Sequence, residues 1–132
     1  IVNKSDQLSG GSSSKKPILL KLSPDESKLN LEKIITYALK NGVDGFILTN
    51  TSLGHDYKLA GGMSGAPLKS AAEECLKFSR SIVGSKIPLI GSGGLMTKED
   101  AIDRFNLSAD LIQLYSGFVF HGNDLLQDCL KI

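Results

Sequence analysis

Two kinds of segment alternate along the chain: short apolar runs, and longer stretches whose apolar residues recur at helical spacing. The apolar runs lie at 17–23 (PILLKLS), 44–51 (DGFILTNT), 87–91 (IPLIG) and 109–117 (ADLIQLYSG). Runs of this length that are apolar at nearly every position are typical of strands buried on both faces of a sheet. Each run therefore predicts a β-strand.

Helical periodicity fills the segments between the runs. From residue 31 the apolar positions fall at i, i+3, i+4, i+7 and i+8, which predicts a helix with Asn30 as its N-cap and Gly42 just beyond its end. Further helices are expected over 68–83, after an N-cap at Thr97, and over 124–132. Strands and helices that alternate at this spacing predict a parallel sheet in an α/β fold.

Four βα units are half of an eight-stranded (β/α)₈ barrel. Such a barrel takes about 250 residues, whereas this chain has 132. The chain is therefore expected to be a fragment or a four-stranded unit that pairs with another copy, because open parallel edges need a partner. Residues 1–16 are polar and rich in Ser, Gly and Lys, which predicts a flexible loop or linker.

Composition narrows the function classes. The chain is 41% apolar and carries a net charge of +1, which is typical of a globular segment and gives no reason to expect a nucleic-acid partner. No window approaches the roughly 18 consecutive apolar residues of a membrane span. Cys75 and Cys129 stand far apart without metal-ligand spacing, so they are expected to be reduced and packed, and no metal site is predicted.

The last two apolar runs lead into glycine-containing sequences, GSGG and LYSG. The loops after the last two strands of such barrels often hold a phosphate, and glycines let backbone N–H groups approach an anion closely. Gly93 and Gly94, opposite Tyr115 and Ser116 on the adjacent strand end, therefore predict a phosphate cradle. From the glycines alone, a tight strand-to-helix turn without a ligand is the alternative interpretation.

Polar residues also stand at the ends of the first two strands. Lys21 interrupts PILLKLS, and a buried lysine needs an anion or a polar ligand edge, unless its side chain snorkels to water. Asn50, in TNTS, offers both an amide donor and a carbonyl acceptor, which suits an imide or carboxylate edge but also a polar turn. Ser64 and Gly65 lie on a loop long enough to act over a site or to serve as a plain connector.

Taken in order, five stretches resemble the quinone-linked class of the dihydroorotate dehydrogenase family: ILLKLSPD, DGFILTNTS, GGMSGAPL, IPLIGSGG and LIQLYSG. The resemblance runs from about Pro17 to the end of the chain. GGMSGAPL and QLYS are the features that resemble the quinone-linked class rather than the fumarate- or NAD-linked ones. The resemblance implies that residues 17–132 form the C-terminal half of an FMN-binding TIM barrel.

The implied activity is an oxidoreductase of pyrimidine biosynthesis that oxidises dihydroorotate to orotate through FMN and passes the electrons to ubiquinone. In this class the catalytic base is a serine in the N-terminal half, so no catalytic residue is expected in this chain. The N-terminal half of the same enzyme is therefore an expected partner. The full-length enzyme is expected to be membrane-associated, at the mitochondrial inner membrane in a eukaryote or the cytoplasmic membrane in a bacterium.

The resemblance also carries residue roles onto matching positions. The implied cofactor-binding residues are Lys21, Thr49, Ser64, Gly65, Gly94, Tyr115 and Ser116. The implied substrate-binding residues are Asn50 and Thr51, and Lys21 would stabilise negative charge on the flavin ring. Two alternatives stay open at this point: half of a different phosphate-binding barrel, and a non-catalytic half-barrel that completes a partner chain.

Overall fold

Strands and helices alternate along the computed structural model, which describes residues 16–58 and 60–132. Apart from Lys16, the linker predicted over 1–16 lies outside these described residues. The strands are β1 (Leu19–Leu22), β2 (Gly45–Leu48), β3 (Leu89–Ser92) and β4 (Leu111–Gln113). The helices are α2 (Lys28–Lys40), α3 (Lys69–Val83) after the 3₁₀ turn η1 (Ala66–Leu68), α4 (Lys98–Asn106) and α5 (Ser116–Cys129). The predicted α/β class is confirmed.

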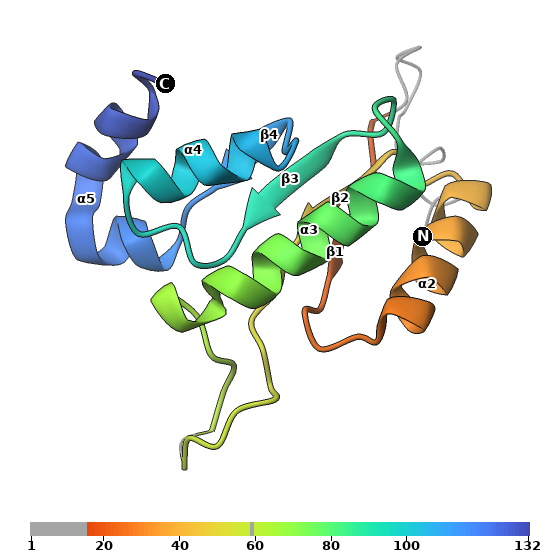
Figure 1. Ribbon diagram of the computed structural model, residues 1–132, viewed down its shortest axis with the longest axis horizontal. Helices are drawn as coiled ribbons and strands as arrows, with labels where there is room; N and C mark the ends of the chain where they lie inside the picture. Colours follow the sequence, from red (N-terminus) through yellow and green to blue (C-terminus); the bar gives the residue numbers. More distant parts are fainter. Residues whose placement is uncertain (1–15, 59) are drawn as a thin grey trace.

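The four strands form one parallel sheet in the order β1-β2-β3-β4, and α2, α3 and α4 pack against it, whereas α5 packs beside α4 (Figure 1). Leu22, Phe46 and Leu89 on one face of the sheet join Ile35 of α2 and Leu76 of α3 in a buried core. This is the arrangement expected of consecutive βα units of a barrel, in which the helices form the outer layer.

The opposite face of the sheet lacks such a layer among the described residues. Lys21, Ile47, Ile90 and Leu111 lie side by side across it, one on each strand. Leu111 is 59% exposed, although it lies on a strand. In a closed barrel, side chains on this face fill the interior, so the exposed face is where the remaining strands of a barrel would close.

The first helix begins earlier than the periodicity predicts. Its N-cap is Ser27, whose Oγ accepts a hydrogen bond from the backbone N–H of Asn30 at 3.2 Å, so Asn30 lies within the first turn. The N-cap prediction of Asn30 is therefore wrong, because Leu29 in the first turn is 61% exposed and lies off the apolar stripe that begins at Leu31. Gly42, with φ of 81°, follows the C-cap residue Asn41, as predicted.

The last strand and the last helix also differ from prediction. β4 covers only part of the strand predicted over 109–117, and α5 begins at Ser116 rather than at 124. The two glycines of α5 disfavour a helix locally and concealed it. Gly117 nevertheless fits, because a Cβ there would lie 2.1 Å from the carbonyl oxygen of Leu95, and Gly122 kinks the helix with φ of 60°.

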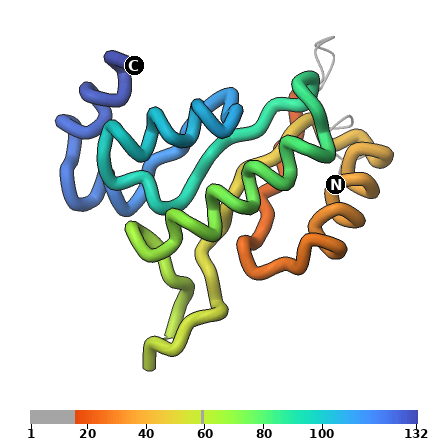
Figure 2. The backbone as a smooth tube through the Cα atoms, viewed as in Figure 1, coloured from red at the N-terminus to blue at the C-terminus, as the bar shows by residue number. Residues whose placement is uncertain are grey.

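The connection between β2 and α3 projects away from the sheet, as the backbone trace shows (Figure 2). An antiparallel bridge between Ser52 and Met63 joins its two arms at the base. We call the described residues between these two positions the projecting loop. No helix in the described part of the chain is both long enough and apolar enough to span a membrane.

Candidate functional site

A cavity lies at the carboxyl ends of the strands, the end at which barrels of this kind place their sites. About 450 Å³ of free space lies in and around it, and every βα unit contributes to its wall. All of the residues that the sequence predicts for cofactor or substrate binding border it: Lys21, Thr49, Asn50, Thr51, Ser64, Gly65, Gly94, Tyr115 and Ser116. The structure thus brings these residues together, and the group that each would bind remains a prediction.

Lys21 reaches the cavity from β1, on the sheet face opposite the core. Its Nζ donates a hydrogen bond to Oε1 of Gln113, at 3.4 Å. Gln113 lies on β4 and also borders the cavity, but the sequence analysis did not single it out. The available signal was the alternation along β4, which places Leu111 and Gln113 on the same face.

Thr49 directly follows β2 and supplies a buried hydroxyl to the cavity wall. Its backbone N–H donates to the carbonyl oxygen of Ser92 at 2.7 Å, which holds the two strand ends together. The side chain is only 2% exposed, and Oγ1 has no hydrogen-bond partner among the residues that the structure describes. An unpartnered buried hydroxyl is unfavourable by about 1–3 kcal/mol, a penalty that a hydrogen bond to a ligand would remove.

Asn50 and Thr51 continue the same strand end along the cavity. The backbone N–H of Asn50 donates to the carbonyl oxygen of Leu22 at 2.7 Å, which fixes this segment against β1. The Asn50 side chain is exposed and no hydrogen bond fixes it within the described chain. Its amide donor and acceptor are therefore free to meet a ligand.

A serine pair connects the segment after the projecting loop to the start of α5. Ser64 Oγ and Ser116 Oγ lie 2.9 Å apart, within hydrogen-bond distance. Gly65 next to this pair has φ of 72°, a left-handed conformation that favours glycine. Tyr115, the residue before α5, is 78% exposed at the cavity edge.

The GSGG stretch turns from β3 towards α4, and its glycines meet separate requirements. Gly93 and Gly94 have φ of 95° and 74°, which side-chain-bearing residues rarely adopt. A Cβ on Gly94 would also lie 2.3 Å from Cα of Lys69, and a Cβ on Gly91 would lie 2.3 Å from Cγ of Arg104. Turn geometry and packing therefore require these glycines with or without an anion.

A cluster of charged residues fixes the segment that follows this turn. Lys69 Nζ donates to Oδ1 of Asp100 at 2.6 Å and to Oδ2 of Asp103 at 2.8 Å. The other oxygen of Asp100 accepts the backbone N–H of Met96 and of Thr97, each at 2.9 Å. Thr97 Oγ1 accepts the N–H of Asp100 in return, which completes a capping box and confirms Thr97 as the N-cap.

The cluster perturbs the titration of its members. Hydrogen bonds to Asp100 and Asp103 raise the pKa of the Lys69 ammonium well above its usual value. Burial raises the pKa of Asp100, but the hydrogen bonds from Lys69, Met96 and Thr97 together outweigh burial and hold it below its usual range. Both side chains therefore stay charged at neutral pH.

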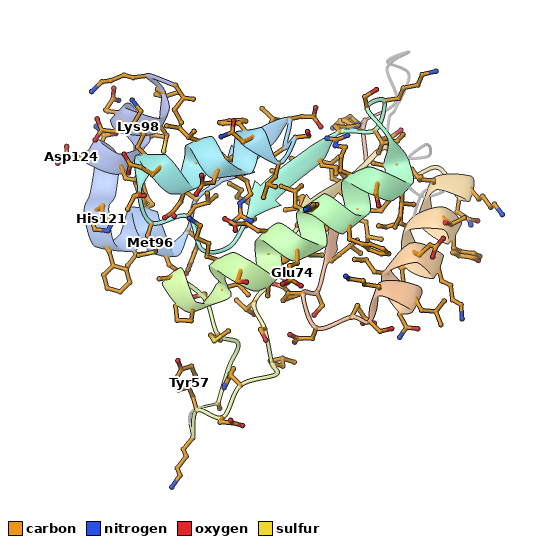
Figure 3. The ribbon with its side chains drawn as sticks, viewed as in Figure 1. Tyr57, Glu74, Met96, Lys98, His121 and Asp124 are labelled. Carbon is orange, nitrogen blue, oxygen red and sulfur yellow. The ribbon has the colours of Figure 1, made fainter. Side chains whose placement is uncertain are left out.

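Asp25 fixes the base of the projecting loop. Its carboxylate accepts the Ser52 hydroxyl at 2.6 Å and the backbone N–H of Leu53 at 2.7 Å, and these hydrogen bonds lower its pKa. Further out along the loop, His55 and Tyr57 pack with ring centroids 5.2 Å apart, and Figure 3 labels Tyr57 there. The sequence analysis did not identify Asp25, because its partners lie more than 25 residues away.

Comparison with known proteins gives consistent matches. A family model described as dihydroorotate dehydrogenase matches residues 2–131. A dihydroorotate dehydrogenase (quinone) of Shewanella sediminis is 39% identical over 122 residues, which are 87% of this chain and 36% of the relative. A protein of the same name from Dichelobacter nodosus is 36% identical over 134 residues, 96% of this chain and 40% of the relative.

Solved structures match as well. The crystal structure of DHODH from Eimeria tenella in complex with ferulenol superposes with a TM-score of 0.81 and 26% identity, covering 92% of this chain and 34% of that one. The ligand-free DHODH of the same organism gives a TM-score of 0.79 and 28% identity, covering 89% and 35%. The chain spans between about a third and two fifths of the length of these relatives.

Proposed function

This chain belongs to the dihydroorotate dehydrogenase family, and we propose that it supplies the C-terminal βα units of a quinone-linked enzyme that oxidises dihydroorotate to orotate. The observation that carries the proposal is the single cavity that Lys21, Asn50 and Gly94 border together at the carboxyl ends of the strands. Family membership favours this function over half of a different phosphate-binding barrel.

FMN is the cofactor that we propose for this cavity, and the wall residues fit it. Thr49 offers a buried hydroxyl without a partner in the described chain, and Lys21 offers a positive charge. Gly94 and the start of α5 at Ser116 bring backbone N–H groups and the positive end of a helix dipole to one side of the cavity, as a phosphate requires. Bound FMN would supply the redox chemistry by accepting a hydride.

The protein's part is then to bind, orient and stabilise charge. Lys21 would hold the flavin ring through its ammonium, in the place where negative charge develops during the reaction. Asn50 and Thr51 would orient the pyrimidine by hydrogen bonds from a segment whose backbone is fixed to β1. Gln113 would keep the Lys21 ammonium directed into the cavity through their 3.4 Å contact.

The rest of the site is expected from outside this chain. The serine base, the quinone site and the first strands of the barrel would come from the N-terminal half of the enzyme, which would cover the exposed sheet face. Membrane association would likewise belong to the complete enzyme. Leu19 and Leu111, which are 37% and 59% exposed on that face, are the side chains that such closure would bury.

Acceptor specificity tests this function in the complete protein that contains the chain. Orotate formation from dihydroorotate is followed by its absorbance with a soluble ubiquinone analogue, with fumarate, or with NAD as the sole electron acceptor. We expect turnover with the quinone and none with the other two. Equal turnover with fumarate or NAD would contradict the quinone-linked class, and no orotate with any acceptor would contradict the activity.

A further inference from the structure

Arg104 of α4 is a buried cation behind the GSGG turn. Its side chain is 0% exposed, the largest side chain in the described chain that is fully buried. Nη2 donates a hydrogen bond to the carbonyl oxygen of Gly93 at 2.7 Å. Nε and Nη1 are buried and have no hydrogen-bond partner within the described ranges.

The residues around this guanidinium leave space for its side chain and carry the opposite charge. Gly91 leaves room for its stem, because a Cβ there would lie 2.3 Å from Cγ and 2.9 Å from Cδ of Arg104. Burial lowers the pKa of Arg104, while the carboxylates of Glu73, Asp100 and Asp103 oppose that shift. Because arginine cannot lose its proton in a protein, the residue stays charged.

Packing alone does not account for such a residue. An apolar side chain of similar volume fills a buried position without the penalty of desolvating a charge, and it often stabilises the protein. Arg104 instead leaves two donors unpaired and directs a third at one carbonyl group. That carbonyl belongs to Gly93, at the cavity wall, whereas Arg104 itself does not border the cavity.

We propose that Arg104 is a positioning residue for the phosphate cradle. In a trans peptide the C=O of Gly93 and the N–H of Gly94 point in opposite directions. The guanidinium draws the Gly93 carbonyl away from the cavity and thereby directs the Gly94 N–H towards the anion. The inference rests on the proposed function, because it takes the phosphate of FMN as that anion, and it gives Gly91 a role as the space for Arg104.

The preference of the protein for FMN over riboflavin tests this role, because riboflavin lacks the phosphate. Dissociation constants for both flavins are measured by fluorescence quenching on the apo form of the complete protein. The variants are Arg104→Met and, as a matched control, Arg80→Met. Arg80 also holds backbone carbonyls, at 2.6 Å from Ser108 and from Gly84, but it lies away from the cavity.

We expect Arg104→Met to reduce the preference for FMN by about tenfold to a hundredfold, the effect of losing a charged hydrogen-bond donor. Arg80→Met should leave the preference unchanged. Gly91→Ala should resemble Arg104→Met, because the added Cβ displaces the guanidinium. Partial unfolding weakens the binding of both flavins equally and leaves the ratio of their dissociation constants unchanged. An unchanged ratio in Arg104→Met therefore counts against the proposal.

The failures of the two proposals are distinguishable. A wild-type protein that binds neither flavin, or binds both equally, contradicts the phosphate cradle of the proposed function and this inference with it. A wild-type protein that prefers FMN, together with an Arg104→Met variant that keeps the full preference, overturns the role of Arg104 alone. If Arg104→Met does not fold, Gly91→Ala decides in the same way, because its added Cβ would displace the guanidinium while the charge of Arg104 is kept.

Discussion

The Asp100 carboxylate joins three segments, and replacing it with asparagine is expected to break its link to α3. One oxygen accepts Lys69 of α3 at 2.6 Å, and the other accepts the N–H groups of Met96 and Thr97 at 2.9 Å each. In Asp100→Asn the amide oxygen still accepts the two N–H groups. The amide nitrogen then faces the Lys69 ammonium, which loses one of its carboxylate partners.

The expected loss of stability in Asp100→Asn follows from this geometry. A hydrogen bond to a charged group contributes about 1.5–3 kcal/mol, and the pair is mostly shielded from water, since the Asp100 side chain is 13% exposed. Asp103 remains 2.8 Å from Lys69 and offsets part of the loss. We therefore expect Asp100→Asn to lower the free energy of unfolding by about 2 kcal/mol. Asp103→Asn is the control, and at 52% exposure its loss should be about 0–1 kcal/mol.

The difference between wild type and Asp100→Asn should depend on pH. The pKa of Asp100 is lowered in the folded state, whereas an aspartate in the unfolded chain titrates near 3.9. Its stabilisation is therefore complete well above pH 4 and is lost as the pH falls through the lower folded-state value. The free energies of unfolding of wild type and variant should therefore become equal in acid. Both proteins should still lose stability as the pH falls, because Asp25 and Asp110, whose pKa values are also lowered, remain in the variant.

Urea unfolding of the complete protein, followed by circular dichroism at pH 7 and at steps down to pH 3, measures both effects. The reasoning would be refuted if Asp100→Asn and Asp103→Asn lowered stability equally at pH 7. It would also fail if the gap between wild type and Asp100→Asn stayed constant over the whole pH range.

Three further predictions concern other parts of the fold. Lys21→Met should slow bleaching of the flavin by dihydroorotate about a hundredfold in stopped flow, because a positive charge at the reaction site is lost; Lys33→Met on α2 is the control, and equal rates in both would exclude the role of Lys21. Arg80→Ala should lower the free energy of unfolding by about 2–4 kcal/mol without changing the flavin spectrum, and an unchanged urea midpoint would contradict this. Asp25→Asn should release the base of the projecting loop and speed chymotrypsin cleavage at Tyr57, which is 59% exposed; unchanged cleavage would show that the loop is held otherwise.

The sequence predicted the α/β class because the core pattern of each βα unit is local. The runs around Phe46 and Leu89 are apolar without interruption, the run around Leu22 is interrupted by Lys21 alone, and the apolar stripe of α2 is regular. The ends of the helices were harder to predict from the sequence. α2 begins after the cap Ser27, before its apolar stripe starts at Leu31, and α5 begins next to Gly117, which packs closely against the backbone of Leu95.

The candidate site was predictable where its residues follow strands directly. Lys21, Asn50 and Gly94 reach one cavity because parallel strands end at the same edge of a sheet. Asp25 and Arg104 were not predictable, because their roles depend on contacts with Ser52 and with Gly93 that only the tertiary structure creates. Nothing in the residues around a buried arginine distinguishes it from one on a solvated helix face.

The most direct test of the proposed function is the visible absorption spectrum of the purified complete protein, recorded anaerobically before and after addition of dihydroorotate. We expect a flavin band that remains after dialysis and is bleached by dihydroorotate. A colourless protein that takes up no FMN, or a flavin band that dihydroorotate leaves unchanged, would contradict the proposed dehydrogenase.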